Sequence, residues 1–338
     1  MEETLIEQMQ EQYERPSPTI VPPMSSRGPR YHTPVLKEES IQALALKPTG
    51  TYIDCTLGDG GHFQAIIDGL RQGATAIGLD RDPEAISWCN ATIDKKKVTV
   101  LLKQERFSRF DRVLEELHIR GVDGILLDLG LSSRQIAIDS RGFSYMKNVK
   151  LDMRMDPKDS RTAADILCNA SKEELVRILS DYGEIKNPSR MAETILRYRG
   201  RSSLSTSDDL KQCLREEYGD YLNIKMLAKL FQALRIAVND ELVELQRCCE
   251  QAVDKLLPGG RLAVIAYHSL EDRFVKNFMR DAESTCQCPP SSPVCNCGKK
   301  KLLKRITKKA IVASSLETSR NPASRSARLR VAEKTAHE

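Results

Sequence analysis

A glycine-rich segment with the sequence DCTLGDGGH, Asp54–His62, is the first part of the chain whose residue types suggest chemistry. Glycines let a backbone approach a ligand closely, and the N-terminus of a following helix favours polar or anionic groups. Asp80 lies 22 residues after Gly58, at the end of the next apolar run. A carboxylate in that position can accept hydrogen bonds from both hydroxyls of a ribose. The two features together predict a site for a nucleoside-containing cofactor, with a simple tight turn as the alternative for the glycines alone.

The spacing of these glycines separates two classes of cofactor. The dinucleotide fingerprint requires a third glycine three residues after the second, for tight packing of helix on strand. Counted from Gly58 and Gly60, that position is Phe63. The segment fits instead the pattern Asp-x-x-x-Gly-x-Gly, typical of S-adenosylmethionine sites, where no pyrophosphate has to be accommodated. We therefore expect S-adenosylmethionine as the cofactor.

Asp128 follows another buried apolar run, in the sequence DLGLSS. Several methyltransferases that act on amino groups place an acid or amide here, where it can hold an exocyclic amine with its lone pair facing the methyl group. Their usual Pro-Pro-aromatic continuation is missing from this chain. Asp128 is therefore predicted to orient an amine, with a structural carboxylate capping the next turn as the alternative.

His268 and Ser269 stand side by side after a further apolar run. A hydrolase triad is disfavoured, because the chain contains no Gly-x-Ser-x-Gly elbow. Ser269 is predicted to cap the following helix, with Asp272 completing an approximate capping box. His268 is predicted to contact substrate or cofactor, and a histidine of the core is the alternative.

Four cysteines fall within twelve residues, at Cys286, Cys288, Cys295 and Cys297. Four thiolates suit tetrahedral Zn²⁺, although Cys-x-x-Cys pairs are more usual in structural zinc sites than the Cys-x-Cys pairs found here. A reduced loop able to form adventitious disulfides is the alternative to structural zinc.

The elements that must position these residues alternate between apolar runs and amphipathic stretches. Such alternation predicts βαβ units and a Rossmann-like α/β fold with a parallel sheet. Strands are expected over 51–55, 74–80, 98–102, 124–129 and 261–267, and helices over 62–70, 83–93, 107–118, 171–180, 188–199, 206–217, 224–257 and 269–281.

The alternation stops after Leu131, and several helical patterns follow without a convincing strand. The simplest organisation is one α/β domain interrupted by an inserted all-helical domain. The expected boundaries are a disordered leader at 1–30, the α/β domain at 31–135, the helical insertion at 136–230, and at 231–338 the rest of the α/β domain with the cysteine-rich loop and a basic tail.

Charge is distributed unevenly along the 338 residues, whose formal net charge is +5. Residues 1–14 sum to −5, residues 299–330 sum to +10, and the remainder is neutral. A basic segment points to a polyanionic partner, with a solvated tail that aids solubility as the alternative.

No apolar run reaches the roughly 18 residues of a membrane helix. No secretory or organelle address is found, so a reducing cytoplasm is expected.

Eight segments of this chain together resemble the bacterial 16S ribosomal RNA cytosine-N4 methyltransferase family, methyltransferase H. They extend over nearly the whole chain, and several have no common structural explanation. The segments are YHTPVL at Tyr31–Leu36, DCTLGDGGH at Asp54–His62, DRDPEAI at Asp80–Ile86, DGILLDLGLSSRQ at Asp123–Gln135, RGFSYMKNVKLDMRMD at Arg141–Asp156, FQALRIAVNDE at Phe231–Glu241, PGGRLAVIAYHSLEDR at Pro258–Arg273 and NPASRSARLRVAEK at Asn321–Lys334.

The resemblance implies transfer of a methyl group from S-adenosylmethionine to N4 of a cytidine near the ribosomal P site. It also implies that the partner is 16S ribosomal RNA within the small subunit. The oligomeric state stays open, and a dimer is one of the alternatives. Residues 136–230 become the substrate-binding insertion, and four arginines could contact phosphates or form ordinary salt bridges: Arg141, Arg154, Arg190 and Arg235. The implied cofactor contacts are Gly60, Gly61, His62, Asp80, Phe107, Asp128 and Gln135, besides Gly58 of the glycine segment.

Three departures from the family pattern concern substrate contacts more than the cofactor. The family usually has Asp-Gly-Pro where this chain has Asn148–Lys150, a His-containing motif where it has Ile224–Lys229, and Gly or Arg at Asp59. Two other functions stay open: a methyltransferase for a protein or small molecule, and a non-catalytic RNA-binding assembly factor on a degenerate fold. The intact glycine segment, Asp80 and Asp128 disfavour the second.

Overall fold

The computed structural model describes residues 33–95, 98–288 and 297–336. The expected leader at 1–30, the first two residues of the YHTPVL segment and Cys295 lie outside these ranges. Among the residues within them, every helix is too short or too polar to span a membrane.

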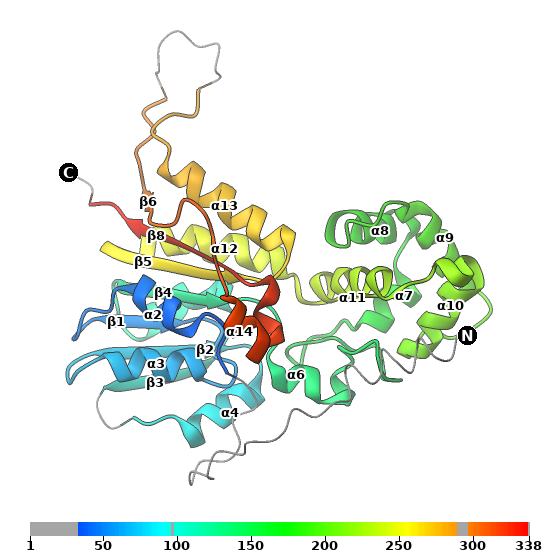
Figure 1. The fold of residues 1–338 in the computed structure, drawn as a ribbon, viewed down its shortest axis with the longest axis horizontal. Coiled ribbons are helices and arrows are strands. Elements are labelled where there is room, and N and C mark those ends of the chain that lie inside the picture. Colours follow the sequence, from blue (N-terminus) through cyan, green and yellow to red (C-terminus); the bar gives the residue numbers. More distant parts are fainter. Residues whose placement is uncertain (1–32, 96–97, 289–296, 337–338) are drawn as a thin grey trace. The chain divides into compact units, whose positions relative to one another are not determined.

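A single sheet organises the α/β part, in the strand order β3-β2-β1-β4-β5-β8-β6, with β7 paired to β8 (Figure 1). The first five strands of that order are parallel, and β8 runs antiparallel to β5. This parallel-dominated sheet confirms the predicted fold class. The strands are β1 at Thr51–Asp54, β2 at Thr75–Asp80, β3 at Thr99–Gln104, β4 at Val122–Asp128, β5 at Leu256–Ala266, β6 at Leu303–Arg305, β7 at Ile311–Val312 and β8 at Arg328–Lys334.

Apolar side chains cover both faces of this sheet, because successive residues of a strand point to opposite sides. In β4, Ile125 and Leu127 join one hydrophobic cluster, and Leu126 between them joins another. The first cluster packs against α5 (Phe110–Glu116), α12 (Glu241–Lys255) and α13 (Ser269–Glu283). The second packs against α2 (Lys37–Leu44), α3 (Gly61–Gly69) and α4 (Pro83–Thr92). Helices on both faces explain why the strands are almost continuously apolar in sequence.

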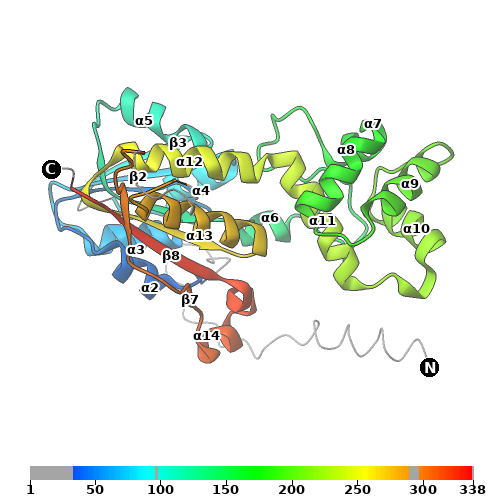
Figure 2. The same cartoon turned by 90° about the horizontal axis from the view of Figure 1, so that it is seen from above.

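The segment between β4 and α12 is helical, as predicted, and has a hydrophobic core of its own. Among its described residues the only β pairing is an isolated bridge between Lys150 and Thr206. Figures 1 and 2 show its helices in green. They are α6 at Ser133–Ala137, α7 at Ala163–Asn169, α8 at Lys172–Arg177, α9 at Pro188–Arg199, α10 at Ser207–Tyr218 and α11 at Ile224–Asn239.

The single helix expected over 224–257 is wrong, because the structure divides it into α11 and α12 at Asp240. Asp240 has a left-handed backbone, with φ of 52°, which Asp and Asn tolerate better than most residues. The fully buried Asn239 side chain fixes the break: its Nδ2 donates to Met153 O at 2.7 Å, and its Oδ1 accepts from Met155 N at 2.9 Å. The helix then ends at Lys255, and Pro258–Gly260 belong to β5 rather than to a loop.

The basic segment 299–330, expected as a tail, is partly folded into the sheet. Within it lie β6, β7 and α14 (Ser315–Arg320), and it leads into β8, which pairs with β5 over six residues from Arg261 to Ala266. Leu329 and Val331 are fully buried, while Arg330 of the same strand pairs with Asp272 at 2.6 Å. The strand alternates apolar and basic residues, so its charges conceal its pattern in the sequence.

Candidate active site at the carboxyl edge of the sheet

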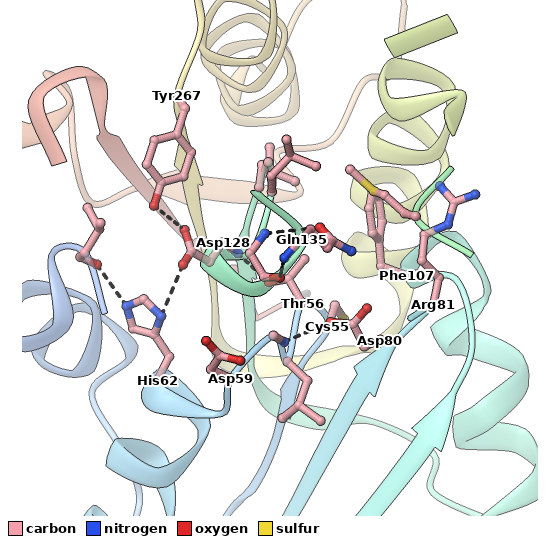
Figure 3. Close-up of a pocket in the computed structure, with 18 of the residues that line it drawn as sticks. Cys55, Thr56, Asp59, His62, Asp80, Arg81, Phe107, Asp128, Gln135 and Tyr267 are labelled. Atoms are coloured by element: carbon pink, nitrogen blue, oxygen red, sulfur yellow. Dashed lines mark hydrogen bonds and ion pairs between the residues drawn. The ribbon is translucent and has the colours of Figure 1, made fainter. Parts of the chain in front are cut away.

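One cavity of about 330 Å³ lies where the parallel strands β1, β2, β4 and β5 end. Open α/β sheets bind ligands in this position, outside the carboxyl ends of their strands. Figure 3 shows the side chains that converge here from different strands. Of the predicted site residues, Gly58, Gly61, His62, Asp80, Phe107, Asp128 and Gln135 line this cavity, whereas Gly60 and His268 do not.

The glycine segment turns from β1 into α3 and forms one wall of the cavity. Gly58 and Gly60 have positive φ values of 49° and 77°, which glycine adopts without steric cost. A Cβ on Gly61 would lie 2.2 Å from Pro34 Cγ. A Cβ on Gly60 would lie 2.9 Å from Cys89 Sγ, so this glycine permits packing against α4 rather than contact with a ligand. Phe63, at the position of the missing third glycine, is fully buried beneath this turn.

Asp80, at the end of β2, is tied directly to the glycine segment. Its Oδ2 accepts a hydrogen bond from Gly58 N at 2.8 Å, and its Oδ1 accepts one from Asp82 N at 2.8 Å. Burial raises the pKa of Asp80 to about 6, and these two N–H donors oppose that rise. A carboxylate oxygen has lone pairs for a second donor, so Asp80 can still accept the hydroxyls of a ligand.

Asp128, at the end of β4, is held from three sides (Figure 3). Tyr267 donates its hydroxyl to Asp128 Oδ1 at 2.8 Å, and His62 Nδ1 lies 3.4 Å from Oδ2. The backbone N–H of Asp128 donates to Thr56 Oγ1 at 2.6 Å. The Asp128 side chain is still 24% exposed. Its carboxylate is therefore fixed in direction and retains a face toward the cavity.

His62 and Tyr267 have titration properties that follow from this contact. Burial disfavours the imidazolium of His62, but Asp128 and Asp54 outweigh burial and raise its pKa. Nε2 of His62 lies 2.9 Å from Val35 O and can donate to it, so the protonated ring satisfies Val35 and Asp128 together. Burial and the charge of Asp128 raise the pKa of Tyr267, which remains a hydrogen-bond donor.

Gln135 and Phe107 close the cavity from two further elements. Gln135 belongs to a capping box at the start of α6: its Oε1 accepts from Ser132 N at 3.2 Å, and its Nε2 donates to Asp82 Oδ2 at 3.0 Å. Phe107 begins the short helical turn after β3 and lines the cavity near Arg81 (Figure 3). An aromatic ring at this edge offers a face on which a base can stack.

His268 reaches the cavity only through Glu271. Its Nε2 lies 3.0 Å from Glu271 Oε1, and Glu271, which lines the cavity, also accepts from Tyr267 N at 3.0 Å. The predicted cap at Ser269 is wrong by one residue, because α13 begins at Ser269 and His268 occupies the cap position. The Ser269 hydroxyl donates instead to Glu184 Oε2 at 2.7 Å, and Asp272 pairs with Arg330.

Tyr267, Arg81 and Asp82 are not singled out by the sequence, because their partners lie far away in the chain. Tyr267 ends the predicted strand 261–267 and Arg81 directly follows the predicted strand 74–80, positions that could have marked them. Arg235, one of the four arginines expected to contact phosphates or form salt bridges, forms a salt bridge: it donates to both oxygens of Glu241 at 2.9 Å, and only the fold brings this pair to the cavity. Asp82 caps α4 ahead of Pro83, a helix-start signal that is visible in the sequence.

Three of the four predicted metal-ligand cysteines, Cys286, Cys288 and Cys297, lie together between α13 and β6, away from the cavity. The fourth, Cys295, is outside the described residues.

The cavity fits a nucleoside-containing cofactor on its own geometry. Its volume of about 330 Å³ falls within the range of small-molecule sites, roughly 300–1,000 Å³. Asp80 supplies acceptors for hydroxyls, and Phe107 supplies a stacking face.

Comparison with known sequences gives concordant matches. A sequence model described as the MraW methylase family matches residues 30–335. Proteins named ribosomal RNA small subunit methyltransferase H match at 45% identity from Heliobacterium mobile (313 residues; 90% of this chain, 99% of the relative) and at 40% from Desulfosudis oleivorans (307 residues; 90% and 98%). The protein of that name from Fusobacterium nucleatum is 38% identical over 311 residues, covering 92% of this chain and 99% of its own length. A solved rRNA methylase from Streptococcus thermophilus covers 89% of this chain and 94% of its own, at 9% identity and a TM-score of 0.37.

Proposed function

The chain belongs to the MraW methylase family, and from that premise we propose that it transfers the methyl group of S-adenosylmethionine to N4 of a cytidine in 16S ribosomal RNA, near the P site of the small subunit. The relatives named ribosomal RNA small subunit methyltransferase H, matched over 98–99% of their length, support the class of substrate. The cytoplasm, where small subunits are assembled, is the proposed site of action.

The observation that carries this proposal is the arrangement around Asp128. A carboxylate beside the glycine segment and Asp80 is fixed by Tyr267 and His62, and still faces the cavity. This arrangement suits a substrate whose methylated atom is an amine nitrogen. A carboxylate with one free face can accept a hydrogen bond from the exocyclic N–H of such a substrate. A purely structural carboxylate would be satisfied by its neighbours without facing a cavity.

Bound S-adenosylmethionine supplies a methyl group on a positively charged sulfur, which is already an activated leaving group. The protein then has to align the attacking nitrogen with that methyl group, and such alignment accounts for much of the rate that an enzyme gains. N4 of cytosine is a weak nucleophile because its lone pair is conjugated with the ring. A hydrogen bond from N4–H to Asp128 would favour a pyramidal amine whose lone pair is no longer conjugated with the ring, so attack requires no prior deprotonation. As the N4–C bond forms and the S–C bond breaks, the sulfur would keep the bonding electron pair, and the extra N4 proton would pass to Asp128 or to solvent.

We assign three further groups to binding. Gly58, Gly61 and Asp80 would hold the nucleoside of the cofactor, Phe107 would stack on its base, and Gln135 would position the loop through Asp82. His268 acts through Glu271 and is a positioning residue in this proposal. The helical segment 136–230 is proposed as the substrate-binding insertion, within the division 1–30, 31–135, 136–230 and 231–338 expected from the sequence. The target cytidine must leave its stack to reach Asp128.

The proposal can be tested with labelled cofactor and two forms of substrate, naked 16S RNA and immature small subunits. Mass spectrometry of nuclease digests should show N4-methylcytidine in one 16S fragment that contains P-site nucleotides. A methylated base other than cytidine, or a label in the carbon framework of the base, would contradict the N4 assignment. If label enters only protein or small molecules, the alternative methyltransferase holds; if cofactor fails to bind at all, the non-catalytic alternative holds.

A further inference from the structure

A cluster of sulfur atoms stands apart from the cavity, in the segment between α13 and β6. The Sγ atoms of Cys286, Cys288 and Cys297 all lie within 4.8 Å of one another. Cys286 is exposed, and the other two are half-buried, so hydrophobic packing does not explain why the three gather. Nothing in the proposed methyl transfer uses them.

Backbone N–H groups point at two of these sulfurs. Cys288 N donates to Cys286 Sγ at 3.3 Å, and Gln287 N donates to Cys297 Sγ at 3.4 Å. Hydrogen bonds of this kind stabilise a thiolate relative to a thiol, because they favour the charged form. Gly298, directly after Cys297, has a φ of 60°, the left-handed conformation that glycine adopts freely. The backbone is thus folded around the sulfurs from both ends of the segment.

The base of the segment is fixed to the body. Leu302 N donates to Ala282 O at 2.9 Å, and Arg305 binds the Glu283 carboxylate through its backbone N at 3.0 Å and through Nε at 2.6 Å. Beyond this base the cysteines belong to none of the three hydrophobic clusters. A small unit without a hydrophobic core commonly depends on a metal or a disulfide for its conformation.

From this geometry we infer that Cys286, Cys288 and Cys297 bind a structural Zn²⁺ ion as thiolates. Zn–S bonds of about 2.3 Å in a tetrahedron place sulfurs about 3.8 Å apart, so the cluster needs to contract by only about 1 Å. Binding releases the three thiol protons to solvent, and no oxidant or reductant is required. The three thiolates leave the ion with a net negative charge, and two lysines, Lys299 and Lys300, follow within three residues of Cys297 in the sequence.

The other group of potential metal ligands, Glu241, His268 and Glu271, is less suited to a cation. Arg235 already donates to both oxygens of Glu241, and a guanidinium beside the group repels a metal ion. Thiolates also select zinc over the oxygen-preferring ions. The cysteine cluster is therefore the metal site that the structure favours.

Metal analysis of the full chain, expressed without a histidine tag and purified without chelator, tests this inference. We expect about one Zn²⁺ per chain, with at least three sulfur neighbours at about 2.3 Å in X-ray absorption. Cobalt exchanged into the site should give an intense thiolate charge-transfer band and the visible bands of a tetrahedral ion. A content below about a tenth of an equivalent, with no such band after cobalt addition, would overturn the inference.

Matched variants locate the site and separate it from folding. C297S and C286S should lose most of the metal, whereas C168S, which removes an exposed cysteine of α7, should retain it. Circular dichroism and cofactor binding should stay close to those of the unmodified chain in all three, since the cluster lies outside the cores. If C297S holds as much metal as C168S, or if thiol titration finds a disulfide among the three cysteines in freshly isolated protein, the site is not the one proposed.

Discussion

Ion pairs at the carboxyl edge of the sheet differ in kind from those on the outer helices. Arg141 and Asp82 lie 2.9 Å apart with side chains only 9% and 3% exposed, and Asp82 also accepts from Gln135. Arg190 and Glu217 lie 2.8 Å apart with side chains 57% and 21% exposed. Water screens the second pair but not the first. The comparison indicates that the inner charges fix the geometry of the site, while the outer charges are free to exchange partners.

The sharpest test of this difference is D82A. Removing Asp82 leaves the buried Arg141 guanidinium with only the half-exposed Glu84 carboxylate, 3.9 Å away, as a counter-charge. Breaking a buried ion pair in this way typically costs about 3–5 kcal/mol in free energy of unfolding. Denaturant unfolding followed by circular dichroism measures the loss. The double variant D82A/R141M should recover part of it, because the uncompensated charge is then absent. If D82A were as stable as the unmodified chain, the inner pair would be no different from a surface pair.

D128N should have the next largest effect, on catalysis rather than on stability. The amide keeps the shape of the carboxylate, but it weakens the acceptor that faces the cavity and alters the contact with His62. We expect kcat to fall by about 100-fold or more while the affinity for cofactor changes little. Single-turnover methylation of small subunits measures the first quantity and calorimetry the second.

Y267F serves as the control for D128N. It removes the hydroxyl that donates to Asp128 Oδ1 but keeps the carboxylate. The expected fall in kcat is about 10-fold, intermediate between D128N and the unmodified chain. Equal rates for D128N and the unmodified chain would assign Asp128 to structure alone.

D80A should weaken cofactor binding by about 10- to 100-fold. This is the loss of affinity expected when hydrogen bonds from the cofactor to a charged acceptor are removed. Gly58 N also loses its partner in this variant, so the turn of the glycine segment should loosen. Calorimetric titration with cofactor measures the effect. D59A is a useful comparison, because the Asp59 carboxylate pairs with Arg134 at 2.9 Å. If D59A lost as much affinity for the cofactor as D80A, the result would contradict a specific hydrogen bond between Asp80 and the cofactor.

The pH dependence of cofactor affinity should report the same carboxylate. Asp80 is ionised above its raised pKa of about 6 and becomes protonated below it. Affinity should therefore be constant from pH 8 to about 7 and fall up to about tenfold for each pH unit below 6. Burial also raises the pKa of Asp54 to about 7, so its protonation overlaps this range. A D80N variant separates the two: its affinity should be low and nearly independent of pH between about 5 and 7.

The parts of this site that could be predicted from the sequence are those whose chemistry is local. Asp80 and Asp128 end apolar strands, and the glycines follow another, so strand pattern and residue type place them together at one edge of the sheet. The motif resemblance is likewise confirmed by family membership. The partners of Asp128 could not be predicted, because Tyr267, directly after β5, is 139 residues away in the chain. His62 was expected at the cofactor, but its contacts with Asp128 and Val35 depend on tertiary structure.

Two features of the fold were missed for related reasons. No glycine or proline marks the break at Asp240, which depends on a buried Asn239 bound to Met153 and Met155. The pattern of β8 is obscured by its arginines, one of which is buried only because Asp272 faces it. In both cases a buried polar side chain is stabilised by a partner that is far away in the sequence and is brought close only by the fold.

The outer pairs give the smallest expected effect, and E217A tests them most directly. Glu217 accepts from both Arg190 and Arg197, and all three lie at the surface, so its loss should shift the melting temperature by no more than about 2 °C. The same variant leaves two guanidiniums without a carboxylate. If the helical segment binds RNA, affinity for small-subunit RNA should rise slightly. The slope of log affinity against log salt should also become steeper, by up to about one unit for each additional phosphate that an arginine neutralises.

Charge count alone could produce a similar change, so the matched control is E193A. Glu193 lies on α9, the helix that carries Arg190 and Arg197, and pairs with Lys172 at 2.6 Å, with a side chain 56% exposed. Both variants add one net positive charge, but only E217A releases arginines, which bind phosphate with two parallel hydrogen bonds. A steeper salt slope in E217A than in E193A would place phosphate binding at Arg190 and Arg197. Equal slopes would mean that the outer pairs are solvated charges without a role in binding, and the two regions would then differ in burial but not in function.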